Sequence, residues 1–85
     1  MKLILEKAAR KGLDKMSDKA ASVMLDRLEA IAADPVRKHA NVKPLTGYRD
    51  AFRLRQGAWR AVYRLDRQTG EMRVVLVDVR GSVYR

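Results

Sequence analysis

The sequence predicts an α+β fold in which an N-terminal strand and a two-helix hairpin precede a three-stranded antiparallel meander, with the helices on one face of a small sheet. Apolar residues recur at helical spacing before Pro35 and at a spacing of two after Tyr48. Glycines mark turns within the second half. At 85 residues the chain has room for one hydrophobic core, so we expect a single domain over residues 1–85.

The first half is predicted to contain one short strand and two helices. Residues 2–6 favour a strand, and residues 7–16 suit a short amphipathic helix that Gly12 weakens by about 1 kcal/mol relative to alanine. Ser17 and Asp18 are N-cap candidates for a second helix, which Pro35 should end. One apolar stripe runs along this second helix, as expected for packing on a sheet.

The second half is predicted to form a connector and three strands. Residues 36–48 read as a polar connector, and residues 49–55 and 58–66 alternate apolar and basic positions like half-buried strands. Turns are expected at Gly57 and at 67–70. The run 71–79 is apolar at successive positions, which predicts a strand buried on both faces.

The net charge of +9 indicates a polyanionic partner, either nucleic acid or an acidic protein. All lysines lie at or before Lys43, whereas every later basic residue is arginine, the better residue for bidentate phosphate contacts. With no cysteine and one histidine, His39, we expect no metal site and no cofactor. No apolar run approaches a membrane span, and we expect a cytoplasmic protein without a membrane partner.

Arginines should gather on the open face of the predicted sheet. If the hairpins pair as their turns indicate, Arg53, Arg55 and Arg60 project together, and Arg80 at the end of the last strand can join them. Converging guanidinium groups repel one another, so a bound anion would stabilise the set. For any single arginine, a solvated strand face remains the simpler interpretation.

The remaining candidates have plain structural interpretations. His39 reads as an exposed loop histidine, and Phe52, Trp59 and Tyr63 read as core residues rather than a base-stacking platform. Tyr84 lies beyond the last strand, after Gly81, and from local sequence it fits either the cluster or the edge of the core.

The whole chain resembles the RelE/ParE superfamily of type II toxin–antitoxin toxins, and within it the RelE-like branch. The segment DPVRKHANVKPLTGYRDAFRLRQGAWRAVYRLD is similar to the family's helix-end Asp-Pro, its connector ending in Leu-x-Gly, and its two arginine-bearing strands. The closing VDVRGSVYR is similar to the family's terminal Arg…Tyr motif. The resemblance implies the RelE-like microbial RNase fold.

The resemblance also implies an activity, namely ribosome-dependent cleavage of mRNA in the A site by metal-free attack of a ribose 2′-OH. Arg53 and Arg55 match residues that contact the scissile phosphate, and Arg60 matches the residue that stabilises the transition-state charge. Arg80 matches the residue near the leaving oxygen, and Tyr84 matches the tyrosine that stacks on the mRNA base. As further RNA-binding residues we expect Lys43, Arg49 and Arg64.

By resemblance, the partners are an acidic RelB-like antitoxin, the ribosome with its A-site mRNA, and operator DNA reached only through the antitoxin. The chain has Arg53 and Arg55 where the family often has lysine, and Val79 where many members have histidine. Two alternatives therefore stay open. One is a ParE-like inhibitor of DNA gyrase, and the other is an inactive module that only binds its antitoxin.

Overall fold

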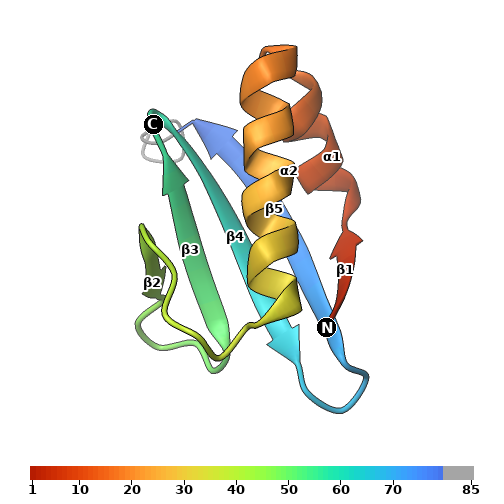
Figure 1. The fold of residues 1–85 in the computed structure, drawn as a ribbon, viewed down its shortest axis with the longest axis vertical. Helices are drawn as coiled ribbons and strands as arrows, with labels where there is room; N and C mark the ends of the chain where they lie inside the picture. Colours follow the sequence, from red (N-terminus) through yellow and green to blue (C-terminus); the bar gives the residue numbers. More distant parts are fainter. Residues whose placement is uncertain (80–85) are drawn as a thin grey trace.

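The structure of the protein is a computed structural model, and residues 1–79 are described. Its elements in chain order, shown in Figure 1, are β1 (Lys2–Leu5), α1 (Lys7–Asp14), α2 (Asp18–Ala33), β2 (Val42–Pro44), β3 (Ala51–Gln56), β4 (Trp59–Asp66) and β5 (Glu71–Val79). Both helices lie on one face of the sheet (Figure 1), so the predicted α+β class and layering are confirmed. Within the described residues, neither helix is long and apolar enough to cross a membrane.

The sheet has five strands in the order β1-β5-β4-β3-β2. β1 runs parallel to β5, and the other neighbours are antiparallel. The strand β2 corrects our interpretation of residues 36–48 as connector only, because Lys43 lies opposite Arg53 in a three-residue edge strand. An edge strand tolerates Pro44 because one of its sides makes no ladder hydrogen bonds.

The second helix begins and ends where the sequence indicates. The hydroxyl oxygen of Ser17 accepts a hydrogen bond from the backbone N–H of Ala20 at 3.2 Å, which satisfies one of the unpaired donors at the helix start. At the other end the helix stops at Ala33, just before Asp34-Pro35. From its inner side Met24, Leu28 and Ile31 enter the core fully buried.

Close contact between α1 and β5 explains the glycine in the first helix. A Cβ built on Gly12 would lie 1.8 Å from the carbonyl oxygen of Val77, so only glycine lets the helix approach the strand this closely. Leu13, on the same helix, is buried in the core beside it. The propensity cost of Gly12 is therefore offset by packing.

The aromatic residues lie as the strand pattern predicts. Tyr63 is buried in the core and stacks on Phe52, with ring centroids 5.4 Å apart. Phe52 and Trp59 are partly buried and pack against the core. The interpretation of these residues as structural is confirmed.

The last strand, β5, is not buried on both faces as we expected. Met72, Val74 and Val77 enter the core, whereas Val75 and Leu76 are only partly buried. The register shifts between Val62 and Tyr63, since Val62 pairs with Leu76 and Tyr63 with Val74. Val75 is the extra residue of a β-bulge, so Val75 and Leu76 both belong to the face without helices.

The Gly12→Ala variant should be less stable than the wild type, although alanine is the better helix former. The added methyl group must push α1 off β5, which we expect to lower the free energy of unfolding by about 1–3 kcal/mol. Urea denaturation measures this change. Arg10→Ala, on the exposed side of the same helix, is the control and should change stability by less than about 0.5 kcal/mol.

Stability should also fall at high pH because of Tyr63. Burial raises the pKa of Tyr63 to about 12 from its ordinary value of 10.0. Below pH 10 the phenol is neutral in both states, whereas between pH 10 and 12 it ionises mainly in the unfolded chain, which draws the equilibrium toward unfolding. Wild type should therefore lose stability across that range more steeply than Tyr63→Phe, and parallel curves for the two proteins would contradict the buried phenol.

Candidate functional site

The predicted arginine cluster forms on the face of the sheet that carries no helices. Arg53 and Arg55 alternate along β3, and Arg60 of β4 lies directly opposite Arg55. Lys43 of β2 lies opposite Arg53. Residues opposite each other in antiparallel strands project to the same face, so these side chains share one surface. We call Lys43, Arg53, Arg55 and Arg60 the cation cluster.

The charges in the cation cluster are unevenly compensated. Arg60 Nε donates to Asp78 Oδ1 at 2.8 Å, and the two side chains are only 13% and 17% exposed. Within residues 1–79, no carboxylate forms an ion pair with Lys43, Arg53 or Arg55. The cluster thus keeps three uncompensated positive charges on adjacent strands, which is a strong local attraction for an anion.

The uncompensated side chains surround a small hollow. Lys43, Arg53 and Arg55 line it together with Asn41, and its volume is about 170 Å³. Arg53 is partly buried, whereas Lys43 and Arg55 are exposed. A hollow with guanidinium and ammonium groups on its walls suits a phosphate, because bidentate N–H donors match phosphate oxygens.

The hollow is held together by Arg27, which the sequence analysis did not single out. From α2, Arg27 donates to the backbone carbonyls of Arg55 at 3.2 Å and Ala40 at 3.0 Å. The N–H of Arg55 in turn donates to the carbonyl of Asn41 at 3.0 Å, where Asn41 adopts a positive φ of 62°. Asparagine accepts this conformation more readily than most residues, and it turns the chain into β2.

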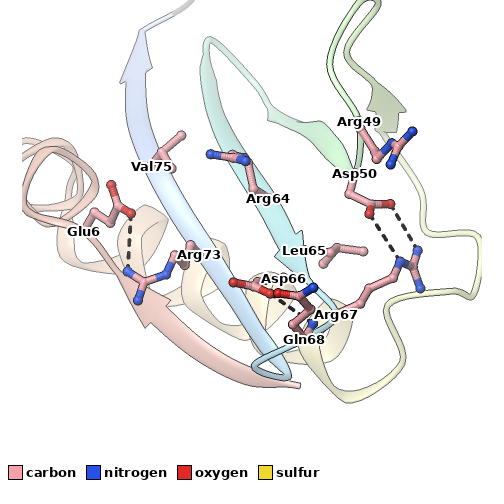
Figure 2. Close-up of a pocket in the computed structure, with 10 residues that line it drawn as sticks. All are labelled: Glu6, Arg49, Asp50, Arg64, Leu65, Asp66, Arg67, Gln68, Arg73 and Val75. Atoms are coloured by element: carbon pink, nitrogen blue, oxygen red, sulfur yellow. Dashed lines mark hydrogen bonds and ion pairs between the residues drawn. The ribbon is translucent and has the colours of Figure 1, made fainter.

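Arg49 and Arg64 lie in a second hollow rather than in the cation cluster. Its volume is about 590 Å³, and Figure 2 shows its lining residues. Arg64 is four residues along β4 from Arg60, a separation of about 13 Å. RNA binding by Arg49 and Arg64 stays a prediction, and the structure places both residues in a different hollow from the cation cluster.

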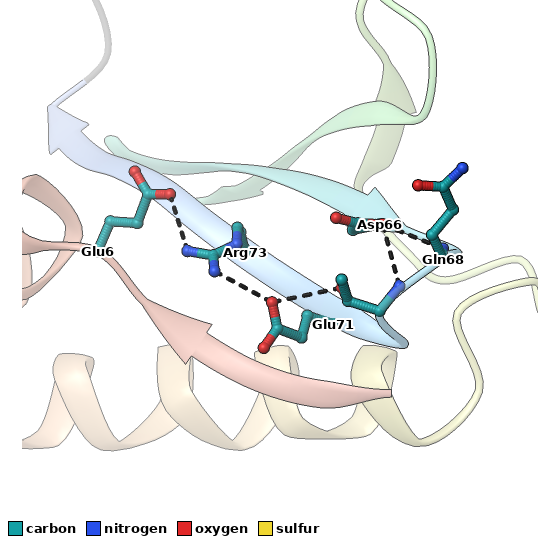
Figure 3. A network of polar contacts seen from close by, with 6 residues as sticks. Glu6, Asp66, Gln68, Glu71 and Arg73 are labelled. Carbon is teal, nitrogen blue, oxygen red and sulfur yellow. Dashed lines mark hydrogen bonds and ion pairs between the residues drawn. The ribbon is translucent and has the colours of Figure 1, made fainter.

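Two arginines at the second hollow, Arg67 and Arg73, form ion pairs with carboxylates. Arg67 donates to both carboxylate oxygens of Asp50 at 3.3 Å. Figure 3 shows Arg73 between Glu6 at 3.5 Å and Glu71 at 3.1 Å. The ends of β1, β4 and β5 therefore carry paired charges, in contrast to β2 and β3.

Asp66 closes the turn between β4 and β5. Hydrogen bonds from the backbone N–H groups of Thr69 and Gln68 lower the pKa of Asp66, with the bond from Thr69 as the largest cause. Gly70 follows with a positive φ of 72°, so the predicted turn at 67–70 is confirmed. This carboxylate has a structural use at the turn.

Two predicted site residues lie outside the described part of the chain. These are Arg80 and Tyr84, which follow the last described residue, Val79. Val79 lies opposite Trp59, one residue before Arg60, so β5 ends beside the cation cluster.

His39 takes no part in the cluster. Its Nε2 lies 2.8 Å from the carbonyl oxygen of Asp34, to which it donates, in the loop after α2. Among residues 1–79, no group of three or more His, Cys, Asp or Glu side chains is arranged to hold a metal ion.

The fold is that of known toxin structures. A chain of the RelBE2 toxin–antitoxin complex from Mycobacterium tuberculosis matches with a TM-score of 0.74 and 23% identity, over 93% of this chain and 96% of that one. Isolated Escherichia coli RelE toxin matches with a TM-score of 0.78 and 23% identity, over 98% of this chain and 89% of that one. A chain of the archaeal RelE–RelB complex from Pyrococcus horikoshii matches with a TM-score of 0.79 and 20% identity, over 95% of this chain and 96% of that one.

Sequence comparison defines the family. The sequence model described as the ParE toxin of the type II toxin–antitoxin system parDE matches residues 3–84. No curated protein sequence matches the chain. The chain belongs to this toxin family, and the predicted membership of the RelE/ParE superfamily of type II toxins is confirmed.

Removing Arg27 should loosen the edge of the site. Arg27→Met keeps most of the side-chain volume but loses both hydrogen bonds to the carbonyls of Arg55 and Ala40. We expect a loss of about 1–2 kcal/mol in stability. Amide hydrogen exchange at Arg55 should be at least about tenfold faster. Arg10→Met is the matched control, and equal exchange in both variants would show that Arg27 does not hold β2 on β3.

Proposed function

We propose that this toxin is a ribosome-dependent mRNA endoribonuclease that acts in the cytoplasm. The observation that carries the proposal is the group of three cations, Lys43, Arg53 and Arg55, that no carboxylate among residues 1–79 neutralises. They surround a hollow beside Arg60 on an exposed sheet face. Such a surface fits the phosphate backbone of a single RNA strand.

In the proposed reaction, a ribose 2′-oxygen attacks the adjacent phosphorus and the bond from phosphorus to the 5′-oxygen breaks. The products are a 2′,3′-cyclic phosphate and a 5′-hydroxyl. Negative charge builds up on the phosphate oxygens in the transition state, and fixed guanidinium groups stabilise it with little reorganisation. We assign this stabilisation to Arg53, Arg55 and Arg60, together with Arg80.

The arginines of the proposed site are poorly suited to transfer protons in this reaction. An arginine stays protonated at neutral pH and is a poor general base or acid. We therefore propose that ribosomal groups accept the 2′-OH proton and protonate the leaving 5′-oxygen, which makes cleavage depend on the ribosome. Tyr84 is proposed to stack on an mRNA base and so orient the 2′-OH for attack.

The other basic residues are proposed to bind RNA outside the scissile phosphate. Lys43 lies across from Arg53 and can hold a neighbouring phosphate. Arg49 and Arg64 lie in the second hollow, and we propose that they contact a more distant part of the RNA or of the ribosome.

An acidic RelB-like antitoxin is the proposed cellular partner, with operator DNA bound only through it. Similar structures include toxin–antitoxin complexes from M. tuberculosis and P. horikoshii. The charge of +9 favours an acidic segment that covers the exposed sheet face.

Inhibition of DNA gyrase is the second candidate function. The matching family model carries the name of the ParE toxin. In addition, Asp78 offsets the charge of Arg60, the residue assigned to transition-state stabilisation. A toxin that binds a protein target does not need an uncompensated arginine at this position.

Mapping mRNA 5′ ends after induction in bacteria distinguishes the two functions. We expect new 5′ ends within codons of translated mRNAs in cells that make the wild-type toxin. Arg53→Ala and Arg55→Ala should each reduce cleavage by about a hundredfold or more, since each removes a donor to the transition state.

Arg37→Ala is the matched control, because Arg37 is exposed in the loop after α2 and lies outside the cation cluster. It should cleave like the wild type. Intact mRNA combined with filamentous cells and DNA damage would support gyrase as the target and refute the RNase proposal.

A further inference from the structure

We propose that Asp78 is a positioning residue of the cation cluster, which holds the guanidinium of Arg60 in place for the phosphate at the cost of weaker RNA binding. This inference rests on the proposed RNase function and adds a residue to it. Three residues lie in a row across three neighbouring strands, namely Arg55 on β3, Arg60 on β4 and Asp78 on β5.

The ion pair in this row differs from the other ion pairs among residues 1–79. Its N–O distance of 2.8 Å is the shortest of the four, and both of its side chains are less than a fifth exposed. Each of the others is 3.1 Å or longer and includes an arginine that is at least 44% exposed. A short, largely buried ion pair restricts its arginine far more than an exposed one does.

A β-bulge brings Asp78 into the row. Next to the turn between β4 and β5, Asp66 pairs with Glu71. If this register continued along the strands without a bulge, Val77 would lie opposite Arg60. The bulge shifts the register by one residue, so Val77 enters the core and Asp78 faces Arg60. Bulges that re-aim a side chain are frequent beside active sites.

The Asp78 carboxylate has two opposing effects on RNA. Its negative charge, next to Arg60 and one strand farther from Arg55, lowers the attraction of the cluster for phosphate. Its bond to Nε fixes the plane of the Arg60 guanidinium, and orientation is what transition-state stabilisation requires. A charge that opposes substrate binding but orients a catalytic group should raise KM and kcat together.

The test compares Asp78→Asn with wild type in binding and in cleavage. Binding is measured with a 2′-O-methyl RNA oligonucleotide, which lacks the attacking hydroxyl, and cleavage is measured on mRNA in a reconstituted translation reaction. Asp78→Asn should bind the oligonucleotide about two- to fourfold more tightly. It should also lower kcat by about ten- to a hundredfold, because a neutral amide oxygen is a weaker acceptor than the carboxylate and holds the Arg60 guanidinium less firmly.

Glu71→Gln is the matched control. It makes the same change of charge on the same strand and face, but Glu71 pairs with Arg73 and lies about 23 Å from Asp78 along β5. That distance exceeds the screening length at physiological salt, so binding and kcat should stay near wild type. Asp78→Glu, which keeps the charge, should recover part of the lost kcat and also serves if Asp78→Asn fails to fold.

Two outcomes of the binding and cleavage measurements overturn the proposal. If Asp78→Asn binds more tightly but cleaves at the wild-type rate, Asp78 contributes charge only. If Asp78→Asn weakens binding while the thermal midpoint falls, the carboxylate is structural.

A readout independent of cleavage separates this proposal from the RNase function. In wild type, the Arg60 Nε–H should give an NMR signal that exchanges slowly with water, with and without the 2′-O-methyl RNA. The exchange should be faster in Asp78→Asn, because its neutral amide oxygen is the weaker acceptor. An Arg60 Nε–H that exchanges as fast as that of exposed Arg37 overturns the positioning role. If protection is seen but mRNA stays intact, the RNase proposal fails while the role of Asp78 in holding Arg60 stands.

Discussion

Both helices pack on one face of a single sheet, and this packing determines where the core and the exposed sheet face lie. It requires the close contact of Gly12 with Val77, which brings α1 onto β5 and closes the core. The opposite face carries no helix (Figure 1), and Arg53, Arg55 and Arg60 lie on it. The uncovered sheet face, where the arginines gather, is therefore a consequence of how the core is built.

Ion pairs are distributed unevenly over the sheet face that carries no helix. Toward β1 and the turn between β4 and β5, Arg67 and Arg73 have acidic partners, and Arg73 lies between Glu6 and Glu71. Toward β2 and β3, Lys43, Arg53 and Arg55 have no acidic partner within the described residues. Folding alone gives no reason to place cations together without compensation, since their repulsion lowers stability. The uncompensated region is thus where an anionic ligand stabilises the protein most.

Much of this arrangement could be predicted from the sequence because its signals are local. The alternation of apolar and basic residues predicted β3 and β4, and the turn at Gly57 set their register, so the shared face of Arg53, Arg55 and Arg60 followed. The strand β2 was missed because it has three residues and ends in Pro44, and only its pairing with β3 makes it a strand. Arg27 was missed because its partners are backbone carbonyls distant in sequence.

The pairing of Arg60 with Asp78 could not be predicted for a different reason. Counting residues from the turn gives the wrong partner, since the bulge at Val75 shifts the register and no residue type in this run marks it. The bulge thus determines both which valine enters the core and which carboxylate reaches the cation cluster. This is the point at which β5 contributes to the candidate site as well as to the core.

We propose that RNA phosphates bind at the cation cluster. The most direct measurement is NMR mapping of the protein during titration with a short 2′-O-methyl RNA at low salt. The largest shifts should fall on the amides of Lys43, Arg53 and Arg55 and on the guanidinium signal of Arg60. Shifts confined to the helices, or to the second hollow around Arg49 and Arg64, would contradict the proposal.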